Sequence, residues 1–526
     1  MSDGKSKGIL VAAVLWVVII GVLAVAAKYL ILPYFNKNLM EKTGSDSQYK
    51  HTLALAADSF SGYAILRSPA MKKELKTLGI RLDIEDDHAD YDARMKALDK
   101  KDTQMAVFTI DSFIQAGEKL GHIPGTIVLV IDESRGADAI VAYKDGVSSI
   151  EDLNHPDAGM VLTPHSPSEF LARTVIAHFN LPLLPESWMI PADGAEDVYK
   201  AFRKEDKTAK RAFVLWEPYV SKALKDSGAH IILDSAKLEG YIVDVLVAER
   251  TFLKDNPDLV RDVVASYLKA AYAYTGSKDT MVSLVMDDAK ETGGESLGKG
   301  TASRMVDRIQ WKNTLENYAY FGLSKSGAPP TSLNLEDMIG NIRDVLVKTG
   351  ALSNTFLEGE EHTLFYTGVL ADLKGANFNP AKKVDVIHGL GSGTGDLDGI
   401  RQAPALAALN DAEWDALKPV GSLRIPPIMF ARGTARINIG SARDLDTLAR
   451  KLTSLPHYYL RVVGHTRAEG DRDANLRLAR ERARAAYDHL VSAGVSPSRL
   501  RAEAAKPSGT DGDNQSVQFI LVEAPF

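Results

Sequence analysis

Small polar side chains follow three predicted strands in the first half of the chain, at the point where each strand ends. They are Ser59, Ser61 and Gly62 after the run HTLALAA, Thr109, Asp111 and Ser112 after MAVF, and Thr163, His165, Ser166 and Ser168 after GMVL. Ligands of open α/β sheets bind beyond the carboxyl ends of the strands, where helix N-termini present free N–H groups. Helix capping uses the same residue types. The recurrence of such clusters at three strand ends therefore predicts a ligand site.

The remaining candidate motifs do not support an active site or a metal centre. The chain has no cysteine, and its 12 histidines include no H-E-x-x-H spacing. Gly294–Gly298 reads GESLG, but the charged residues before it form no strand, which a nucleophile elbow requires. The glycine-rich run at Gly389–Gly395 fits no nucleotide-binding fingerprint and favours a flexible linker. We therefore predict a protein that is not an enzyme and holds no metal or cofactor.

The overall composition is that of a soluble globular protein. The chain has 526 residues, of which 45% are hydrophobic and 25% charged. At roughly 150 residues per domain, this length predicts about three or four domain-sized units. The net charge of −7 disfavours a nucleic-acid-binding protein, which usually carries a basic excess.

One segment near the N-terminus predicts a membrane helix. Gly8–Ala27 carries no charged residue, and a helix of this length spans about 30 Å, the thickness of a bilayer core. Ala24–Ala26 resembles a signal-peptide cleavage site, which leaves cleavage as the alternative. The apolar run exceeds the roughly 7–15 residues usual in a signal peptide. We therefore expect an uncleaved transmembrane helix at residues 8–28, preceded by a short tail at residues 1–7.

The soluble part divides into two regions by its hydrophobic pattern. Across residues 50–350, strand-like and helical runs alternate twice, and the texture then becomes helical. This pattern predicts two α/β units with mainly parallel sheets, joined as a two-lobed body with a cleft. Residues 354–420 are poorer in pattern and are predicted to be a linker. Order returns at residues 425–523, which predict a small α+β unit.

Four segments carry a family resemblance in the first region. They are Ser61–Tyr63 (SGY), Asp132–Val141 (DESRGADAIV), Ile150–Leu153 (IEDL) and Trp216–Tyr219 (WEPY). Together they resemble periplasmic solute-binding proteins of the nitrate, sulfonate and taurine type over residues 50–350. The resemblance implies a bilobal periplasmic-binding-protein fold that closes on a small anion or zwitterion. It also implies contacts from Ser134, walls formed by Trp216 and Tyr63, and Glu217 or Asp244 facing an amino group.

The last region resembles a second family. Gly464-His465-Thr466, followed by Asn475, Leu478 and Arg482-Ala483, is similar to the signature of OmpA-type peptidoglycan-binding domains. The resemblance implies wall contacts from His465, Asn475 and Arg482, with the arginine bonded to a peptide carboxylate. The sequence departs from the family at Arg467, where the family has an aspartate that binds an ammonium group. Repulsion by this arginine would cost roughly 1 kcal/mol.

Together these features predict a single-pass inner-membrane protein, with its N-terminus in the cytoplasm and its soluble domains in the periplasm. It would bind a small anionic or zwitterionic ligand and act in sensing, transport support or envelope stress. Expected partners are the inner membrane, peptidoglycan and a membrane permease or envelope complex, with no nucleic acid. The alternative is a structural envelope interaction protein whose two-lobed unit no longer binds a small molecule.

Overall fold

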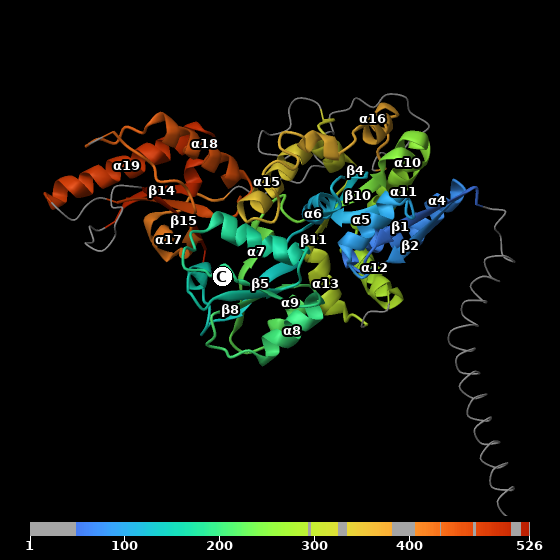
Figure 1. Cartoon of the computed structure of the whole chain (residues 1–526), viewed down its shortest axis with the longest axis horizontal. Coiled ribbons are helices and arrows are strands. Elements are labelled where there is room, and N and C mark those ends of the chain that lie inside the picture. The colour runs from blue at the N-terminus through green and yellow to red at the C-terminus, as the bar shows by residue number, and fades with distance from the viewer. Residues whose placement is uncertain are drawn as a thin grey trace, which may run out of the picture.

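The computed structural model contains three sheets, each belonging to a separate unit (Figure 1). It describes residues 49–292, 296–324, 334–380, 406–431, 433–465, 470–505 and 517–524. The predicted tail, the predicted transmembrane helix and the glycine-rich run at Gly389–Gly395 lie outside these ranges. Within them, no helix is both long enough and apolar enough to cross a membrane.

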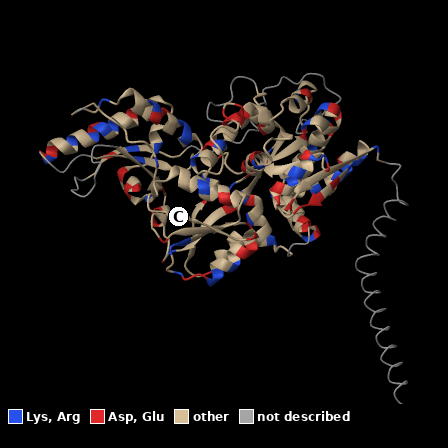
Figure 2. Cartoon of the chain, viewed as in Figure 1, with Lys and Arg blue, Asp and Glu red and all other residues tan. Residues whose placement is uncertain are grey.

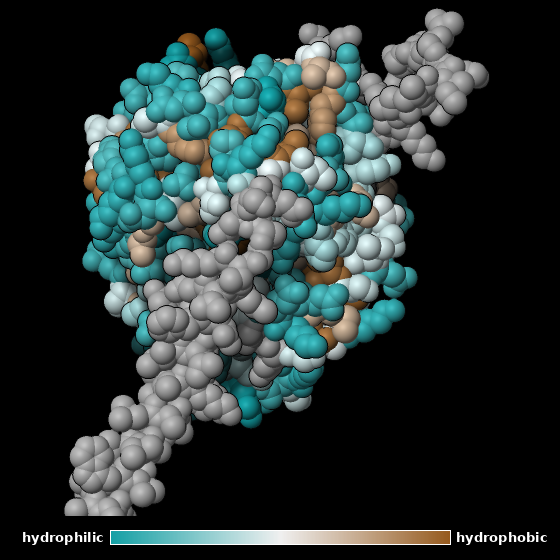
Figure 3. Space-filling model, turned by 90° about the vertical axis from the view of Figure 1, so that its right-hand side faces the viewer, coloured by the Kyte–Doolittle hydropathy of each residue, from teal (hydrophilic) through white to brown (hydrophobic). Residues whose placement is uncertain are grey.

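Lobe 1 is built on a six-stranded sheet in the order β11-β4-β10-β3-β1-β2. Its strands are β1 (His51–Ala57), β2 (Ile80–Asp86), β3 (Met105–Thr109), β4 (Gly125–Ser134), β10 (Val243–Glu249) and β11 (Ile309–Trp311). Its earlier helices are η3 (Ser61–Tyr63), α3 (Ala64–Arg67), α4 (Pro69–Thr77), α5 (Tyr91–Asp99) and α6 (Ile110–Leu120). Its later helices are α10 (Arg250–Asp255), α11 (Pro257–Thr275), α12 (Lys278–Glu291), α13 (Lys299–Arg308), α14 (Thr314–Tyr320) and α15 (Leu335–Lys348). Outside the grey atoms, the face of this lobe seen in Figure 3 is mostly hydrophilic.

Lobe 2 has a five-stranded sheet in the order β7-β6-β8-β5-β9. Its strands are β5 (Asp138–Tyr143), β6 (Gly159–Leu162), β7 (Met189–Pro191), β8 (Arg211–Trp216) and β9 (Ala229–Asp234). Its helices are η4 (Ile150–Leu153), α7 (Pro167–His178), α8 (Gly194–Lys204), α9 (Tyr219–Ala223) and η5 (Ser235–Lys237). Both lobes are thus α/β units, which confirms the two-lobed architecture expected from the sequence.

Both sheets are mixed, so the expectation of mainly parallel sheets is corrected. In lobe 1, β1 runs parallel to β2 and β3, whereas β10 runs antiparallel to β3 and β4. In lobe 2, β6 runs parallel to β7 and β8, whereas β5 runs antiparallel to β8 and β9. The antiparallel strands arise because the chain crosses between the lobes from β4 to β5 and returns from β9 to β10. We call these crossings, residues 135–137 and 235–242, the hinge segments.

The C-terminal domain has a four-stranded sheet in the order β12-β15-β13-β14. Its elements are α17 (Asp411–Ala416), β12 (Lys418–Ser422), α18 (Ile439–Thr453), β13 (Tyr459–Gly464), α19 (Arg472–Ser492), η7 (Pro497–Arg499), β14 (Leu500–Ala504) and β15 (Val517–Glu523). The first strand of this sheet is therefore β12, and not the apolar run at residues 428–430. That run forms only an isolated bridge between Phe430 and Ile437.

The predicted linker at residues 354–420 is too long. At its start, η6 (Glu361–Leu364) and α16 (Gly368–Gly375) pack on lobe 1, where α16 contacts α11. Leu364, Leu370 and Leu373 are buried there, and burial of such side chains stabilises the segment. At its end, α17 and β12 belong to the C-terminal domain. Of the predicted linker, residues 381–405 lie outside the described structure.

The C-terminal domain packs against lobe 2 and one hinge segment. The backbone N–H of Arg424 donates to the carbonyl of His178 at 2.6 Å, at the C-terminal end of α7. In the hinge segment, the N–H of Glu239 donates to the carbonyl of Ser454 at 2.9 Å. Lys237 forms an ion pair of 3.1 Å with Glu523. The domain is therefore in direct contact with the part of the chain about which the two lobes would move.

Candidate ligand site between the lobes

The strand orders place the predicted polar clusters at equivalent points of the two lobes. In lobe 1, β1 lies between β2 and β3. The connections that leave β1 and β2 therefore run to opposite sides of β1, which creates a topological switch point at the carboxyl ends of β1 and β3. In lobe 2, β6 lies between β7 and β8, which creates the same arrangement. Such switch points are where ligands of open α/β sheets bind. We call the boundary where the two lobes meet at these ends the seam.

Two aspartates lie directly opposite each other in the lobe 1 sheet. Asp244 of β10 pairs with Asp132 of β4 on one side and with Thr109 of β3 on the other. All three side chains are buried, with at most 2% of their surface exposed. Directly opposed residues of neighbouring strands share one face of a sheet, so the two carboxyl groups are close neighbours.

The segment Ser61–Tyr63 covers this pair. The hydroxyl of Tyr63 donates a hydrogen bond to Asp244, and the indole N–H of Trp311 donates to the carbonyl of Gly62 at 2.8 Å. A Cβ added to Gly62 would lie 2.5 Å from a carboxyl oxygen of Asp132. Only glycine therefore allows this segment to pack so closely on the Asp132–Asp244 pair.

The pKa values of both aspartates are raised. Burial raises the pKa of Asp132 to about 7, although the contact with Asp244 and the charge of Lys312 each lower it. Burial raises the pKa of Asp244 well above its ordinary range, and the charge of Asp132 adds to the effect. Two carboxyl groups in such a pair cannot both ionise without a nearby cation. Protonation of the pair is therefore favoured, although the Lys312 charge acts in the opposite direction on Asp132.

A third carboxyl group, that of Asp111, faces lobe 2 from the first turn of α6. It is fully buried, and among the described residues neither of its oxygens accepts a hydrogen bond of normal geometry. Burial raises the pKa of Asp111 to about 7, and the negative charges of Glu169 and Asp138 in lobe 2 add to this effect. The Thr109 hydroxyl and the backbone N–H of Asp111 offset it in part.

Lobe 2 contributes a carboxyl group beside an aromatic ring. Asp138 at the start of β5 lies directly opposite Trp216 at the end of β8. The Ser134 hydroxyl donates to Asp138 at 2.6 Å, and burial raises the pKa of Asp138 to about 6. Trp216 is partly buried. It packs against the hydrophobic core of lobe 2 at the strand end opposite Asp138.

The N-terminus of α7 supplies hydroxyl groups on the lobe 2 side. Ser166 caps the helix by accepting from the N–H of Ser168 at 3.2 Å. Glu169 accepts from Arg173 at 2.6 Å and from the N–H of His165 at 2.6 Å. The hydroxyls of Thr163 and Ser168 are buried and have no hydrogen-bond partner among the described residues. They remain able to bond to a ligand.

The basic side chains around the seam are already paired with other acids. Lys312 pairs with Glu133 at 2.6 Å, Arg94 with Asp58 at 3.0 Å, and Arg308 with Glu217. Glu217 also accepts from Ser221 at 2.8 Å. Glu217 therefore forms an ion pair within the chain, in place of the contact with a ligand amino group expected from the sequence.

Most of the residues predicted from the sequence lie at the strand ends of one lobe or the other. Those on the lobe 1 side or in the crossing strand are Ser61, Gly62, Tyr63, Thr109, Asp111, Ser134 and Asp244, and those on the lobe 2 side are Thr163, Ser166, Ser168 and Trp216. Ser59 is exposed and lies outside the group. Sequence reasoning missed Asp132 and Asp138. An acid at the end of the apolar run TIVLVI was the available signal, since buried strands seldom carry one.

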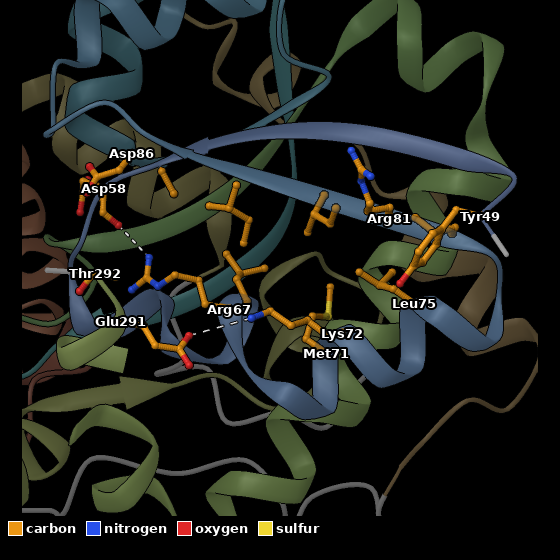
Figure 4. Close-up of a pocket in the computed structure, with 15 residues that line it drawn as sticks. Tyr49, Asp58, Arg67, Met71, Lys72, Leu75, Arg81, Asp86, Glu291 and Thr292 are labelled. Atoms are coloured by element: carbon orange, nitrogen blue, oxygen red, sulfur yellow. Dashed lines mark hydrogen bonds and ion pairs between the residues drawn. The ribbon is translucent and has the colours of Figure 1, made fainter. Parts of the chain in front are cut away.

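A separate cavity of about 660 Å³ lies within lobe 1, between α4 and β2 (Figure 4). Its wall is largely apolar, with Met71 and Leu75 from α4. Two of its basic side chains already have acidic partners: Arg67 bonds to Asp288, outside the lining, at 2.6 Å, and Lys72 lies 4.0 Å from Glu291. The cavity therefore offers fewer unsatisfied polar groups than the seam.

The predicted wall-binding residues lie at one end of the C-terminal domain. His465 follows β13 and contacts the Gln518 side chain at 3.2 Å. Arg482 of α19 is buried, donates from Nε to the carbonyl of Thr434 at 3.2 Å, and lies 5.1 Å from the Phe430 ring. Asn475 lies two turns before Arg482 on the same helix, which carries both basic and acidic residues (Figure 2). Arg467 lies outside the described residues.

Comparison with known proteins identifies the C-terminal domain. Residues 429–517 match the OmpA family model. Over 74 residues the chain is 36% identical to the peptidoglycan-associated lipoprotein of Rhizobium meliloti (strain 1021), covering 14% of this chain and 42% of that protein. Over 91 residues it is 28% identical to the probable lipoprotein YiaD of Escherichia coli (strain K12), covering 17% of this chain and 42% of that protein. The chain thus spans less than half the length of each relative, and the match establishes an OmpA domain only.

For the two-lobed unit, a similar solved structure is the periplasmic aliphatic sulphonate binding protein SsuA from Escherichia coli. It aligns with 14% identity and a TM-score of 0.44, covering 60% of this chain and 92% of that chain. At this sequence identity and TM-score, the match supports no conclusion about a ligand. The two-lobed α/β architecture stands on the sheet topology described above.

Proposed function

We propose that this chain is an envelope-tethered solute-binding protein. Residues 8–28 anchor it in the inner membrane, with the N-terminus in the cytoplasm. The two-lobed unit lies in the periplasm and binds a small molecule in the seam. The OmpA domain contacts peptidoglycan. The protein acts in sensing, transport support or envelope stress rather than in catalysis.

The observation that carries the proposal is the arrangement of polar groups on both sides of the seam. Asp111 and the Asp132–Asp244 pair come from lobe 1, and Asp138 and Ser168 come from lobe 2. Buried polar groups are normally satisfied within a folded protein, and several of these are not. A ligand held between the lobes would satisfy them and would favour closure.

The C-terminal domain supports the location. It matches the OmpA family, and the relatives named above are a peptidoglycan-associated lipoprotein and a probable lipoprotein. Peptidoglycan binding by this domain, which the match supports, would require a location outside the cytoplasm. With the predicted membrane helix at the other end of the chain, the two-lobed unit would then lie between inner membrane and wall.

Protease accessibility in spheroplasts tests the location. Added protease should degrade the soluble domains in spheroplasts that keep an intact inner membrane, and a cytoplasmic marker protein should survive. If the soluble domains are protected until the membrane is lysed, the periplasmic location is wrong.

A second candidate is a structural envelope protein whose two-lobed unit no longer binds a small molecule. The contacts of Glu239 and Lys237 with the C-terminal domain favour it, because they would restrain the hinge segment. Thermal-shift measurements separate the two candidates. A ligand-binding unit should be stabilised by some small solute, whereas a purely structural unit should respond to none.

A further inference from the structure

Four carboxyl groups in the seam have no cationic side chain as partner. They are Asp111, Asp132, Asp138 and Asp244, which we call the seam carboxyls. The basic residues nearby form ion pairs with Asp58, Glu133, Glu169 and Glu217 instead. Within the described structure, no ion pair reaches a seam carboxyl.

These groups are also shielded from water. Each is at most 5% exposed, and burying an ionised carboxylate without a partner is strongly unfavourable. In the protein alone, the cost is reduced by holding protons. The Tyr63 and Ser134 hydroxyls donate one hydrogen bond each, to Asp244 and Asp138. Asp111 accepts none of normal geometry among the described residues. A positively charged ligand would relieve the same cost by direct pairing.

The seam carboxyls are supplied by both lobes. Asp111, Asp132 and Asp244 belong to lobe 1, whereas Asp138 begins the first strand of lobe 2. The charge of Asp138 acts on both Asp111 and Asp132. A cation between them would therefore attract both lobes and favour the closed arrangement.

The aromatic ring beside Asp138 suits an organic cation. Trp216 lies directly opposite Asp138 and is only partly buried. Indole faces attract ammonium and guanidinium groups through the ring quadrupole. Among the described residues, no three histidine or acidic side chains converge in a way that could hold a metal ion. The seam thus has the elements of a site for an organic cation rather than for a metal.

We propose that the seam binds an organic cation, an amine or guanidinium compound with one or two positive charges, through the seam carboxyls and the face of Trp216. This inference rests on the proposed solute-binding function and specifies its ligand class. It replaces the anionic or zwitterionic ligand expected from the sequence. The unpartnered hydroxyls of Thr163 and Ser168 provide neutral hydrogen bonds to the rest of the ligand.

Isothermal titration calorimetry of the full chain tests the ligand class. The cationic probes are agmatine, putrescine and choline. The controls are butane-1-sulfonate, which is an anion, and 1,4-butanediol, which is a neutral match for putrescine. We expect at least one cationic probe to bind and both controls to give no heat of binding.

Variants test the site. Asp111→Asn keeps the shape of the side chain and removes its charge, so it should weaken binding of the cationic probe by at least about tenfold. Trp216→Leu should weaken it severalfold, while Trp216→Phe retains part of the affinity. Asp145→Asn changes an exposed acid of lobe 2 outside the seam and should leave the affinity unchanged. Thermal denaturation of each variant verifies folding.

The possible outcomes separate this inference from the proposed function. Binding of butane-1-sulfonate without binding of any cation would overturn the cationic class and leave solute binding intact. Cation binding that is unaffected by Asp111→Asn would overturn the assignment to the seam. A lack of response to all five compounds would count against both the cationic class and the solute-binding function.

Discussion

The seam and the OmpA domain differ in whether their buried ionisable side chains have hydrogen-bond partners within the chain. In the seam, Asp111 is fully buried and accepts no hydrogen bond of normal geometry from the described residues. In the OmpA domain, Arg482 is equally buried, yet it donates to the Thr434 carbonyl and lies over the Phe430 ring. The carboxyl group of Asp111 therefore lacks a hydrogen bond of normal geometry within the described residues, whereas the guanidinium group of Arg482 has partners within the chain. Burial alone therefore does not mark a binding residue.

Each of the two regions also contains a glycine that allows close packing. Gly62 allows its segment to lie against Asp132, and Gly464 allows the end of β13 to lie against the backbone of α19. In the seam the close contact covers a site. In the OmpA domain it fixes the position of the helix that carries Arg482. Substitution of each glycine should therefore have a different consequence.

The largest effect on stability is expected for Gly464→Ala. The added Cβ would lie 2.0 Å from the carbonyl oxygen of Ala479, and a helix backbone cannot give way cheaply. We expect a loss of about 3 kcal/mol in the OmpA domain. Gly464→Ala should lower the denaturation midpoint of this domain in chemical unfolding, whereas Gly340→Ala, at a site with open space around it, serves as the control. An unchanged midpoint would contradict the packing described here.

The second-largest effect on stability is expected for Asp111→Asn, and its size should depend on pH. Burial raises the pKa of Asp111 to about 7, from an ordinary value near 3.8. The folded protein therefore keeps a proton that the unfolded chain loses, and the free energy of unfolding falls as pH rises from about 4 to 7. Asp111→Asn should remove this loss, giving a gain of about 1–3 kcal/mol at pH 8 and little change at pH 4.

Asp138, Glu169 and Thr109 remain around the substituted side chain, so the difference between wild type and variant isolates Asp111. Urea denaturation at the two pH values measures it. Equal stability of wild type and variant at pH 8 would show that a partner within the chain already compensates Asp111.

Peptidoglycan binding by the OmpA domain should depend on the shape of Arg482. A lysine cannot both reach the Thr434 carbonyl and present a planar group to a wall carboxylate. Arg482→Lys should therefore reduce sedimentation with purified peptidoglycan, corresponding to about a tenfold loss of affinity. If the wild-type chain fails to sediment and Arg467→Asp gains binding, the domain is a converted scaffold and the wall tether is wrong.

The smallest effect is expected where the OmpA domain meets the hinge segment. Lys237 pairs with Glu523 at 3.1 Å and lies 5.7 Å from the Tyr458 ring. Its side chain is 23% exposed, so solvent weakens the pair. Lys237→Ala should cost about 0.5 kcal/mol. Limited proteolysis should then cut more readily between the two units. A large loss of stability would instead mean that the hinge depends on the OmpA domain.

Much of the fold could be predicted from the sequence because it depends on local patterns. The apolar run HTLALAA, buried at its C-terminal half, forms β1, and the predicted amphipathic segment Leu335–Lys348 forms α15. The polar clusters at strand ends were predicted because the end of a strand is visible in the sequence. The linker was predicted too long because α16 is short, and its buried face becomes apparent only against α11.

The acidic character of the seam was not visible in the sequence. Asp132 and Asp244 are separated by more than a hundred residues and meet only because β4 and β10 are neighbours in the sheet. Which acids pair with Lys312 or Arg308, and which remain unpaired, depends on tertiary packing. For this reason the sequence led to an anionic or zwitterionic ligand, whereas the cation proposed above rests on the buried carboxyl groups that the packed structure brings to the seam.

The most direct test is the number of protons exchanged when agmatine binds. Titration calorimetry of the full chain at pH 6.5, in two buffers of different ionisation enthalpy, measures this number. Agmatine is fully charged at this pH, whereas Asp111 and Asp132 have pKa values raised to about 7 by burial. The account predicts that binding releases protons, because the cation replaces them on the seam carboxyls. Binding without release of protons, or with uptake, would contradict it.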